Sequence, residues 1–221
     1  NPMNNARHGH AAAILNGKLY VIGGTGHASV EIYDPQTGQW SAGPALPSSV
    51  TGATAITLND KILLMCGANS SDQELDQVLE LDPATNEWSQ KAATPTARRG
   101  LELVFLDGKC WAIGGKSSSS NTNKVEAYDV ATDSWSTYPS LTVARRWHSA
   151  WVGNGRIYVA GGMDSSNSYL NSIEVFDPDS NQWTTSGMLP ENKHSADAAV
   201  LDGKVYILAG RPSENVYSDK V

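Results

Sequence analysis

The sequence predicts an all-β protein, a β-propeller made of a repeated unit of four antiparallel strands. Tryptophans recur every 48, 47 and 48 residues, each six residues after an aspartate, at Trp40, Trp88, Trp135 and Trp183. A paired-glycine signal precedes every one of them, and no segment shows a sustained 3.6-residue apolar period. A fixed period near fifty residues indicates one supersecondary unit repeated along the chain.

The first two strands of each unit form a hairpin. The first strand reads HAAAILN in the first unit and ADAAVLD in the last. A two-residue turn follows in all five copies, at Asn16-Gly17, Asn59-Asp60, Asp107-Gly108, Asn154-Gly155 and Asp202-Gly203. Such pairs accept the positive φ that a tight hairpin requires. The second strand then ends in the glycine signal, as in LYVIGG and CWAIGG.

The third and fourth strands complete the unit. A polar loop of variable length leads to the third strand, which ends in the repeated aspartate, and a DPxT-type turn leads to the strand that carries the tryptophan. Four antiparallel strands repeated around an axis are typical of a propeller. We expect one domain over 1–221, with units at 10–47, 53–95, 101–142 and 148–190 and an incomplete unit at 196–221.

These residues resemble the kelch repeat, in which a double glycine is followed by a tyrosine and, seven residues later, a tryptophan. Tyr33/Trp40 and Tyr128/Trp135 match fully, whereas Leu81 and Phe176 replace the tyrosine in the other two units. Cys66 and Ala209 replace the first glycine of two pairs. Kelch propellers commonly have six blades, so the resemblance implies a fragment of a six-bladed ring. A five-bladed ring fits less well, because residues 1–9 are too few for two strands.

Composition narrows the function classes. The net charge of −7 disfavours nucleic acid or an anionic membrane surface as the main partner. No apolar run approaches eighteen residues. Cys66 and Cys110 lie in apolar second strands and are expected to be buried thiols, which favours a reducing, cytoplasmic setting.

Aligning the units reveals basic residues just before each first strand. The two positions read Arg7-His8, Val50-Thr51, Arg98-Arg99, Arg145-Arg146 and Lys193-His194. Equivalent positions in a propeller form a ring on one face, so this pattern predicts a basic rim on an acidic protein. Arginine can grip a carboxylate bidentately. The alternative is structural: these cations could bind loop carbonyls or nearby acids, of which the sequence offers Glu102, Asp197, Glu31, Glu126 and Glu174.

The loops between the second and third strands are a second candidate surface. They are rich in serine and asparagine and vary in length, as in SSSSNTN and DSSNSY. Variable polar loops on a rigid scaffold suit recognition, although they also serve as plain connectors. Tyr169 is predicted to be an exposed aromatic residue among them.

Signals for catalysis are sparse, and we predict no catalytic, metal or cofactor-binding residue. His10 and His148 share a column, but the other units supply no further metal ligand there. The kelch resemblance leaves open an enzyme acting on an anionic sugar, such as a sialic acid epimerase, in which Glu102 would move a proton. A copper radical oxidase is less compatible, because neither cysteine lies in a loop of the binding face.

The resemblance favours a protein-interaction module, similar to the substrate-binding kelch domain of BTB-kelch adaptors of ubiquitin ligases. It implies a partner segment of acidic character, bound by the rim and the loops. The residues expected to bind it are Arg7, His8, Arg98, Arg99, Arg145, Arg146, Lys193, His194 and Tyr169.

Overall fold

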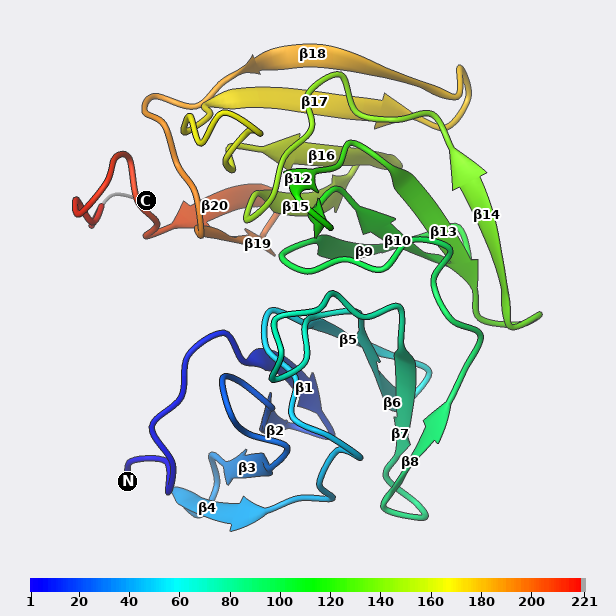
Figure 1. Ribbon diagram of the computed structural model, residues 1–221, viewed down its shortest axis with the longest axis vertical. Coiled ribbons are helices and arrows are strands. Elements are labelled where there is room, and N and C mark those ends of the chain that lie inside the picture. Colours follow the sequence, from blue (N-terminus) through cyan, green and yellow to red (C-terminus); the bar gives the residue numbers. More distant parts are fainter. Residues whose placement is uncertain (220–221) are drawn as a thin grey trace. The chain divides into compact units, whose positions relative to one another are not determined.

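The predicted all-β architecture is confirmed. The computed structural model describes residues 1–219, which form β-strands and loops and contain no helix (Figure 1). Within these residues, accordingly, no helix has the length and hydrophobicity to cross a membrane. The chain divides into two compact units, Asn1–Arg99 and Gly100–Val221, and each is described by itself.

The first unit contains two antiparallel sheets of four strands, each in sequential order. The first sheet comprises β1 (Ala11–Leu15), β2 (Lys18–Ile22), β3 (Val30–Asp34) and β4 (Gln39–Ala42). The second comprises β5 (Thr54–Leu58), β6 (Lys61–Met65), β7 (Val78–Asp82) and β8 (Glu87–Gln90).

The second unit contains two further four-stranded sheets and a hairpin. One sheet comprises β9 (Glu102–Leu106), β10 (Lys109–Ile113), β13 (Val125–Asp129) and β14 (Ser134–Tyr138). The other comprises β15 (Ser149–Gly153), β16 (Arg156–Ala160), β17 (Ser172–Asp177) and β18 (Gln182–Met188). The hairpin pairs β19 (Asp197–Leu201) with β20 (Lys204–Leu208), and a loop contains the short pair β11 (Lys116–Ser117) and β12 (Ser120–Asn121).

The hairpin turns have the predicted geometry. Both residues of every two-residue turn have positive φ, from 51° and 72° at Asn16-Gly17 to 50° and 71° at Asp202-Gly203. This backbone matches the twist of the flanking strands. It explains why the first residue of each turn is Asn or Asp and the second is Gly or Asp.

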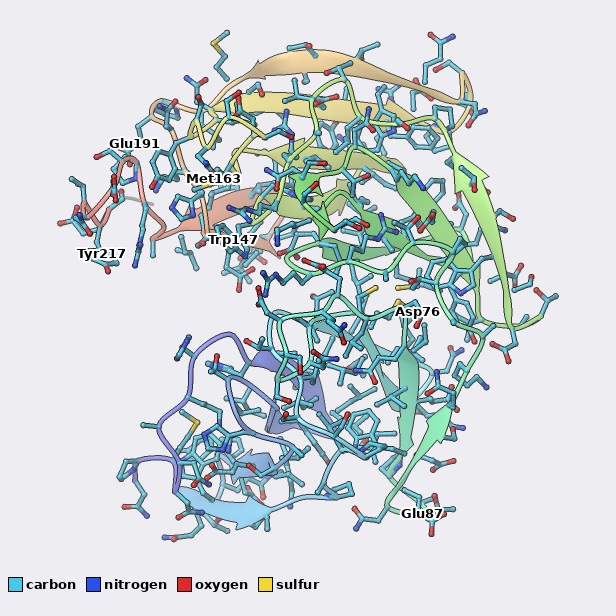
Figure 2. All side chains as sticks on the ribbon, viewed as in Figure 1. Asp76, Glu87, Trp147, Met163, Glu191 and Tyr217 are labelled. Carbon is cyan, nitrogen blue, oxygen red and sulfur yellow. The ribbon has the colours of Figure 1, made fainter. Side chains whose placement is uncertain are left out.

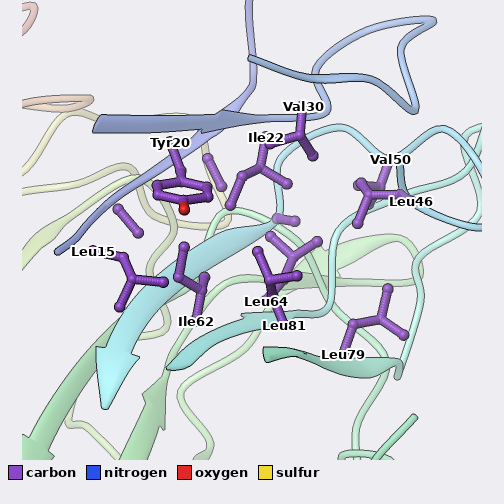
Figure 3. Close-up of a cluster of buried hydrophobic side chains, with 13 residues drawn as sticks. Leu15, Tyr20, Ile22, Val30, Leu46, Val50, Ile62, Leu64, Leu79 and Leu81 are labelled. Carbon is purple, nitrogen blue, oxygen red and sulfur yellow. The ribbon is translucent and has the colours of Figure 1, made fainter. Parts of the chain in front are cut away.

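The core of each unit lies between neighbouring sheets. In the first unit, apolar side chains from β1 and β2 meet those from β6 and β7, with Leu15, Tyr20 and Ile62 among them (Figure 3). The repeated tryptophans close these cores and keep their polar ends bonded: Trp88 Nε1 donates to Pro44 O at 2.9 Å, and Trp183 Nε1 to Pro139 O at 2.9 Å. The two cysteines are buried thiols, as predicted.

The glycine pairs hold the segments that precede the first strands. In the second unit, Gly115 N donates to Arg145 O at 2.8 Å and Gly162 N to Lys193 O at 2.7 Å. A Cβ on Gly161 would lie 2.2 Å from Lys193 O, so only glycine permits this approach. The same bond joins Gly24 N to Val50 O at 2.8 Å in the first unit. The repeat glycines therefore fix the backbone on which the predicted basic residues stand.

Candidate functional site

Three residues before each first strand form what we call the pre-strand segments, at 7–9, 50–52, 98–100, 145–147 and 193–195. Their backbones are bonded on both sides. In segment 145–147, Arg146 and Met163 exchange two backbone bonds of 3.1 and 2.9 Å, in addition to the bond from Gly115. These bonds fix the backbone of the segment on both sides.

The first position points into the protein. Arg7 donates to Gly23 O at 2.8 Å and to Ser29 O at 3.0 Å, and its Nη2 lies 2.5 Å from Glu31 Oε1. Glu31 also accepts bonds from the backbone of Asn4 and Asn5. Burial opposes its charge, but these bonds and the arginine hold the pKa of Glu31 below its usual value. The ion pair is buried, with side-chain exposures of 0% and 4%.

Arg145 repeats this arrangement in the second unit. It donates to Gly161 O at 2.8 Å and pairs with Glu174 at 2.7 Å, with exposures of 0% and 1%. Lys193 replaces the arginine at its own segment and donates to Ala209 O at 2.9 Å. Arg98 is likewise fully buried. The charged ends at the first position thus lie inside the protein rather than on a rim, and the acids that meet Arg7 and Arg145 are on third strands, unlike Glu102 and Asp197.

The second position lies at the surface in the first unit. His8 is exposed, and its Nε2 lies 3.1 Å from Thr25 Oγ1, which in turn lies 3.2 Å from Thr51 Oγ1. Arg99 forks onto the carboxylate of Asp72, with Nη2 3.0 Å from Oδ2, and its Nε lies 3.6 Å from Glu74. Here an arginine at the rim is held by acids of its own unit.

The second position of the second unit has different neighbours. The Arg146 guanidinium lies 4.1 Å from the ring centre of Trp147, and its Nη2 lies 3.4 Å from Asn167 Oδ1. His194 is buried and stacks on Tyr169, with ring centres 4.5 Å apart. Burial, followed by the charges of Arg211 and Arg146, lowers the pKa of His194 and so favours its neutral ring. Tyr169, predicted to be exposed, is half-buried by this stacking.

The loops after the second strands are ordered by their own side chains. Asn69 Oδ1 accepts from the backbone of Ser71 at 2.9 Å and of Gln73 at 3.1 Å, and Asp164 Oδ1 accepts from Ser166 and Ser168, both at 2.8 Å. Such Asx turns replace secondary structure with local side-chain bonds. The serine and asparagine residues therefore give these loops, which lie beside the second position, an ordered conformation.

The acids on the first strands form a separate feature. Glu102 on β9 is half-buried, and burial together with the nearby charge of Asp197 on β19 raises the pKa of Glu102 to about 8. Among residues 1–219, no group of three or more His, Cys, Asp or Glu side chains could hold a metal ion. Two surface depressions, of about 470 and 170 Å³, lie near hairpin turns and include no pre-strand residue.

Comparison with solved structures defines the class of protein. The structure of YjhT superposes with a TM-score of 0.88 over 97% of this chain and 80% of that one, at 18% sequence identity. This likeness concerns the fold, and together with the repeat it makes the chain a kelch β-propeller. Residues 9–210 match the KLHDC2/KLHL20/DRC7 Kelch-repeats domain family, and the chain belongs to that family.

Two curated relatives illustrate the range of the match. The chain is 34% identical to human Kelch-like protein 23 over 177 residues, which cover 76% of this chain and 31% of that protein. It is 30% identical to Alpha-scruin of Limulus polyphemus over 178 residues, which cover 72% of this chain and 19% of that protein. The chain therefore spans between about a fifth and a third of the length of these relatives.

Proposed function

We propose that the protein is an interaction module that binds a segment of a partner protein at the second positions of the pre-strand segments and the loops beside them. One observation carries this proposal. The repeat already satisfies its structural need for a cation at the first position, through buried pairs such as Arg145 with Glu174. A further arginine beside it, Arg146, is not needed for that pair. Arginines at a surface of an acidic protein are suited to recognition.

An acidic partner fits this surface best. Arg146 Nη2 lies near the thioether of Met163 and the amide oxygen of Asn167, and its guanidinium lies over the Trp147 ring; a carboxylate of a partner would be a stronger acceptor than either neutral group. Arg99, in contrast, is gripped by Asp72 and Glu74, and an incoming carboxylate would have to compete with them. We therefore assign the larger share of binding to Arg146, with His8, Arg99, His194 and Tyr169 contributing shape and polarity.

The role of the whole protein extends this proposal. Similarity to Kelch-like proteins, together with the resemblance to BTB-kelch adaptors, favours a substrate adaptor of a ubiquitin ligase. The cytoplasmic setting that we propose for it rests on the two buried thiols. The propeller would capture the substrate, and another part of the protein would contact the ligase. This assignment rests on family resemblance, because fold alone does not determine function.

Selection of binding peptides tests the interaction function. A library of random peptides displayed on phage would be selected on the wild-type protein, and the affinities of the selected peptides measured at low and high salt. We expect acidic peptides whose binding weakens as salt rises, since exposed charges are screened beyond about 8 Å at physiological ionic strength. Selected peptides without acidic residues would contradict the acidic-partner proposal, as would affinities that do not change with salt concentration.

A second candidate, an enzyme acting on a small anionic molecule, has one observation in its favour. Glu102, with a pKa raised to about 8, could hold or release a proton near neutral pH. However, Arg7 is buried in an ion pair with Glu31, and Arg145 in an ion pair with Glu174 rather than with Glu102. Screening the protein with sialic acids by NMR would separate the two functions, because turnover abolished by Glu102→Gln would favour the enzyme.

A further inference from the structure

The third position of the pre-strand segments contains an unusual residue. In three segments it is glycine, with φ of 64° at Gly9, 65° at Gly52 and 62° at Gly100. The last segment has Ser195 there at 52°. In segment 145–147 the residue is Trp147, and its φ is 52°. A bulky residue in the left-handed region is a genuine outlier, and such strain clusters at functional sites.

The fold does not require an indole at this position. The other segments make the same backbone turn with glycine or serine, and the turn itself is held by main-chain bonds: Trp147 N donates to Gly100 O at 2.9 Å, and Ser195 N to Trp147 O at 2.8 Å. Trp147 nevertheless remains 37% exposed. A large aromatic side chain that is strained, exposed and unnecessary for the turn is a candidate for recognition.

The surroundings hold the indole in one orientation. A Cβ on Gly100 would lie 2.8 Å from Trp147 Nε1, so the absence of a side chain at Gly100 makes room for the ring. The Arg146 guanidinium lies over the Trp147 ring, and the centre of the His194 ring lies 5.8 Å from the centre of the Trp147 ring. His194 stacks in turn on Tyr169. A ring fixed in this way loses little conformational entropy when it binds a partner.

Cations and exposed apolar groups continue this surface. His194 and Arg211 exchange backbone bonds of 3.0 and 2.9 Å, and the Arg211 guanidinium lies 4.6 Å from the ring centre of Tyr217, which is 71% exposed. Ring contacts and backbone bonds connect Trp147 through His194 and Arg211 to Tyr217, and Figure 2 labels Trp147 and Tyr217 in the second unit. Aromatic residues and arginine are the residue types enriched at the energetic centres of interfaces.

We propose that Trp147 is the anchor of the binding site: it receives a large apolar or aromatic side chain of a partner protein, while Arg146 binds a carboxylate one or two residues away. Charge complementarity identifies this occupant, because two arginines flank the aromatic surface of a protein with a net charge of −7. The proposal rests on the interaction function above and adds the chemical class of the partner segment. His194 fits a supporting role beneath the surface, since its Nε2 is buried and makes no hydrogen bond.

The test substitutes Trp147→Gly, which restores the residue that three other segments contain. The probes are the phage-selected peptides, and affinity and melting temperature are measured together. We expect Trp147→Gly to weaken binding at least ten-fold and to leave the melting temperature unchanged or higher, since glycine relieves the strained φ. Trp147→Phe, which keeps an aromatic ring, should retain most of the affinity. Met188→Ala, at a 72% exposed apolar residue on β18, is the control and should change neither quantity.

Each outcome decides between the proposals. Selected peptides that lack an apolar side chain near a carboxylate, or that bind Trp147→Gly as tightly as the wild type, would overturn the anchor role. If those peptides still lose affinity in Arg146→Ala, the interaction function stands without it. A lower melting temperature in both Trp147 variants would show that the indole serves packing, which also overturns the proposal. Failure to select any peptide on the wild-type protein would instead refute the interaction function itself.

Discussion

Arg145 and Arg146 are neighbours in sequence and of the same residue type, yet they occupy opposite environments. Arg145 is fully buried and bonded to two carbonyls and to Glu174. Arg146 is half-buried, against Trp147 and the loop residue Asn167. Position within the repeat, rather than residue type, therefore sets the environment of these two arginines: the first is tied into the blade by Glu174 and two carbonyls, and we propose that the second serves binding.

The largest expected effect lies at the first position. We expect Arg145→Ala to lower the free energy of unfolding by about 3–5 kcal/mol, because it leaves the charge of Glu174 buried without its arginine. Chemical denaturation measures this. Arg156→Ala is the matched control: Arg156 also pairs with an acid at 2.7 Å, but it is 48% exposed, and its loss should cost about 0–1 kcal/mol. Equal losses in the two variants would show that the buried pair is not a structural requirement.

The next effect concerns the second position and appears in binding instead of folding. Arg146→Ala should weaken the binding of acidic peptides by about 1.5–3 kcal/mol, the scale of a charge-assisted hydrogen bond. The melting temperature should change little, because Arg146 lies outside the buried pair. Fluorescence anisotropy and thermal melts on the same preparations measure both quantities. A variant that loses stability but retains affinity would reverse the roles of the two positions.

The repeat made most of the fold predictable from the sequence, but not the direction of each arginine side chain. Strand positions, turn pairs and the glycine signal followed from residue types at fixed spacing, and Asn16-Gly17 and Gly24 behave as their types require. Which arginine of a segment is buried could not be predicted, because a column alignment does not show the direction in which each side chain points. The partners Glu31 and Glu174 lie 24 and 29 residues away, across loops of variable length.

Trp147 was missed for a related reason. Alignment of the first two positions drew attention to charge, whereas the informative signal was one residue further along, where a tryptophan interrupts a column of glycines. A left-handed backbone at that column could have been inferred from Gly9, Gly52 and Gly100. The exposure of the indole and its contacts with Arg146 and His194 depend on tertiary packing and required the structure.

Two acids of the second unit, Glu174 and Glu102, differ in whether an arginine pairs with them. Glu174 is held by Arg145, whereas burial and Asp197 raise the pKa of Glu102 from its usual 4.5 to about 8. A raised carboxyl pKa means that folding disfavours the charged form. Its destabilising effect is therefore absent below pH 4.5, grows as the pH rises towards 8, and is constant above that.

Glu102→Gln removes this titration. We expect the variant to match the wild type near pH 4.5 and to be more stable by about 1–2 kcal/mol at pH 8, less than the full pKa shift would allow because Glu102 is only half-buried. Denaturation at a series of pH values measures the difference. A constant difference across this range would indicate that Glu102 titrates normally and that its substitution acts through packing.

The smallest expected effect tests why Arg99 and Arg146 differ although both stand at the second position. Asp72, which is 72% exposed, holds the Arg99 guanidinium and adds a negative charge to the surface where an acidic partner would dock. Asp72→Ala should leave stability nearly unchanged, since exposed ion pairs contribute only about 0.2–1 kcal/mol. It should also strengthen the binding of acidic peptides about two-fold, because Arg99 becomes available and one repulsion is lost. Arg99→Ala in the same background should remove that gain, whereas in the wild type it should change affinity less than Arg146→Ala does. If Asp72→Ala weakens binding instead, the Asp72–Arg99 pair itself shapes the docking surface, and the two arginines would then act by different mechanisms.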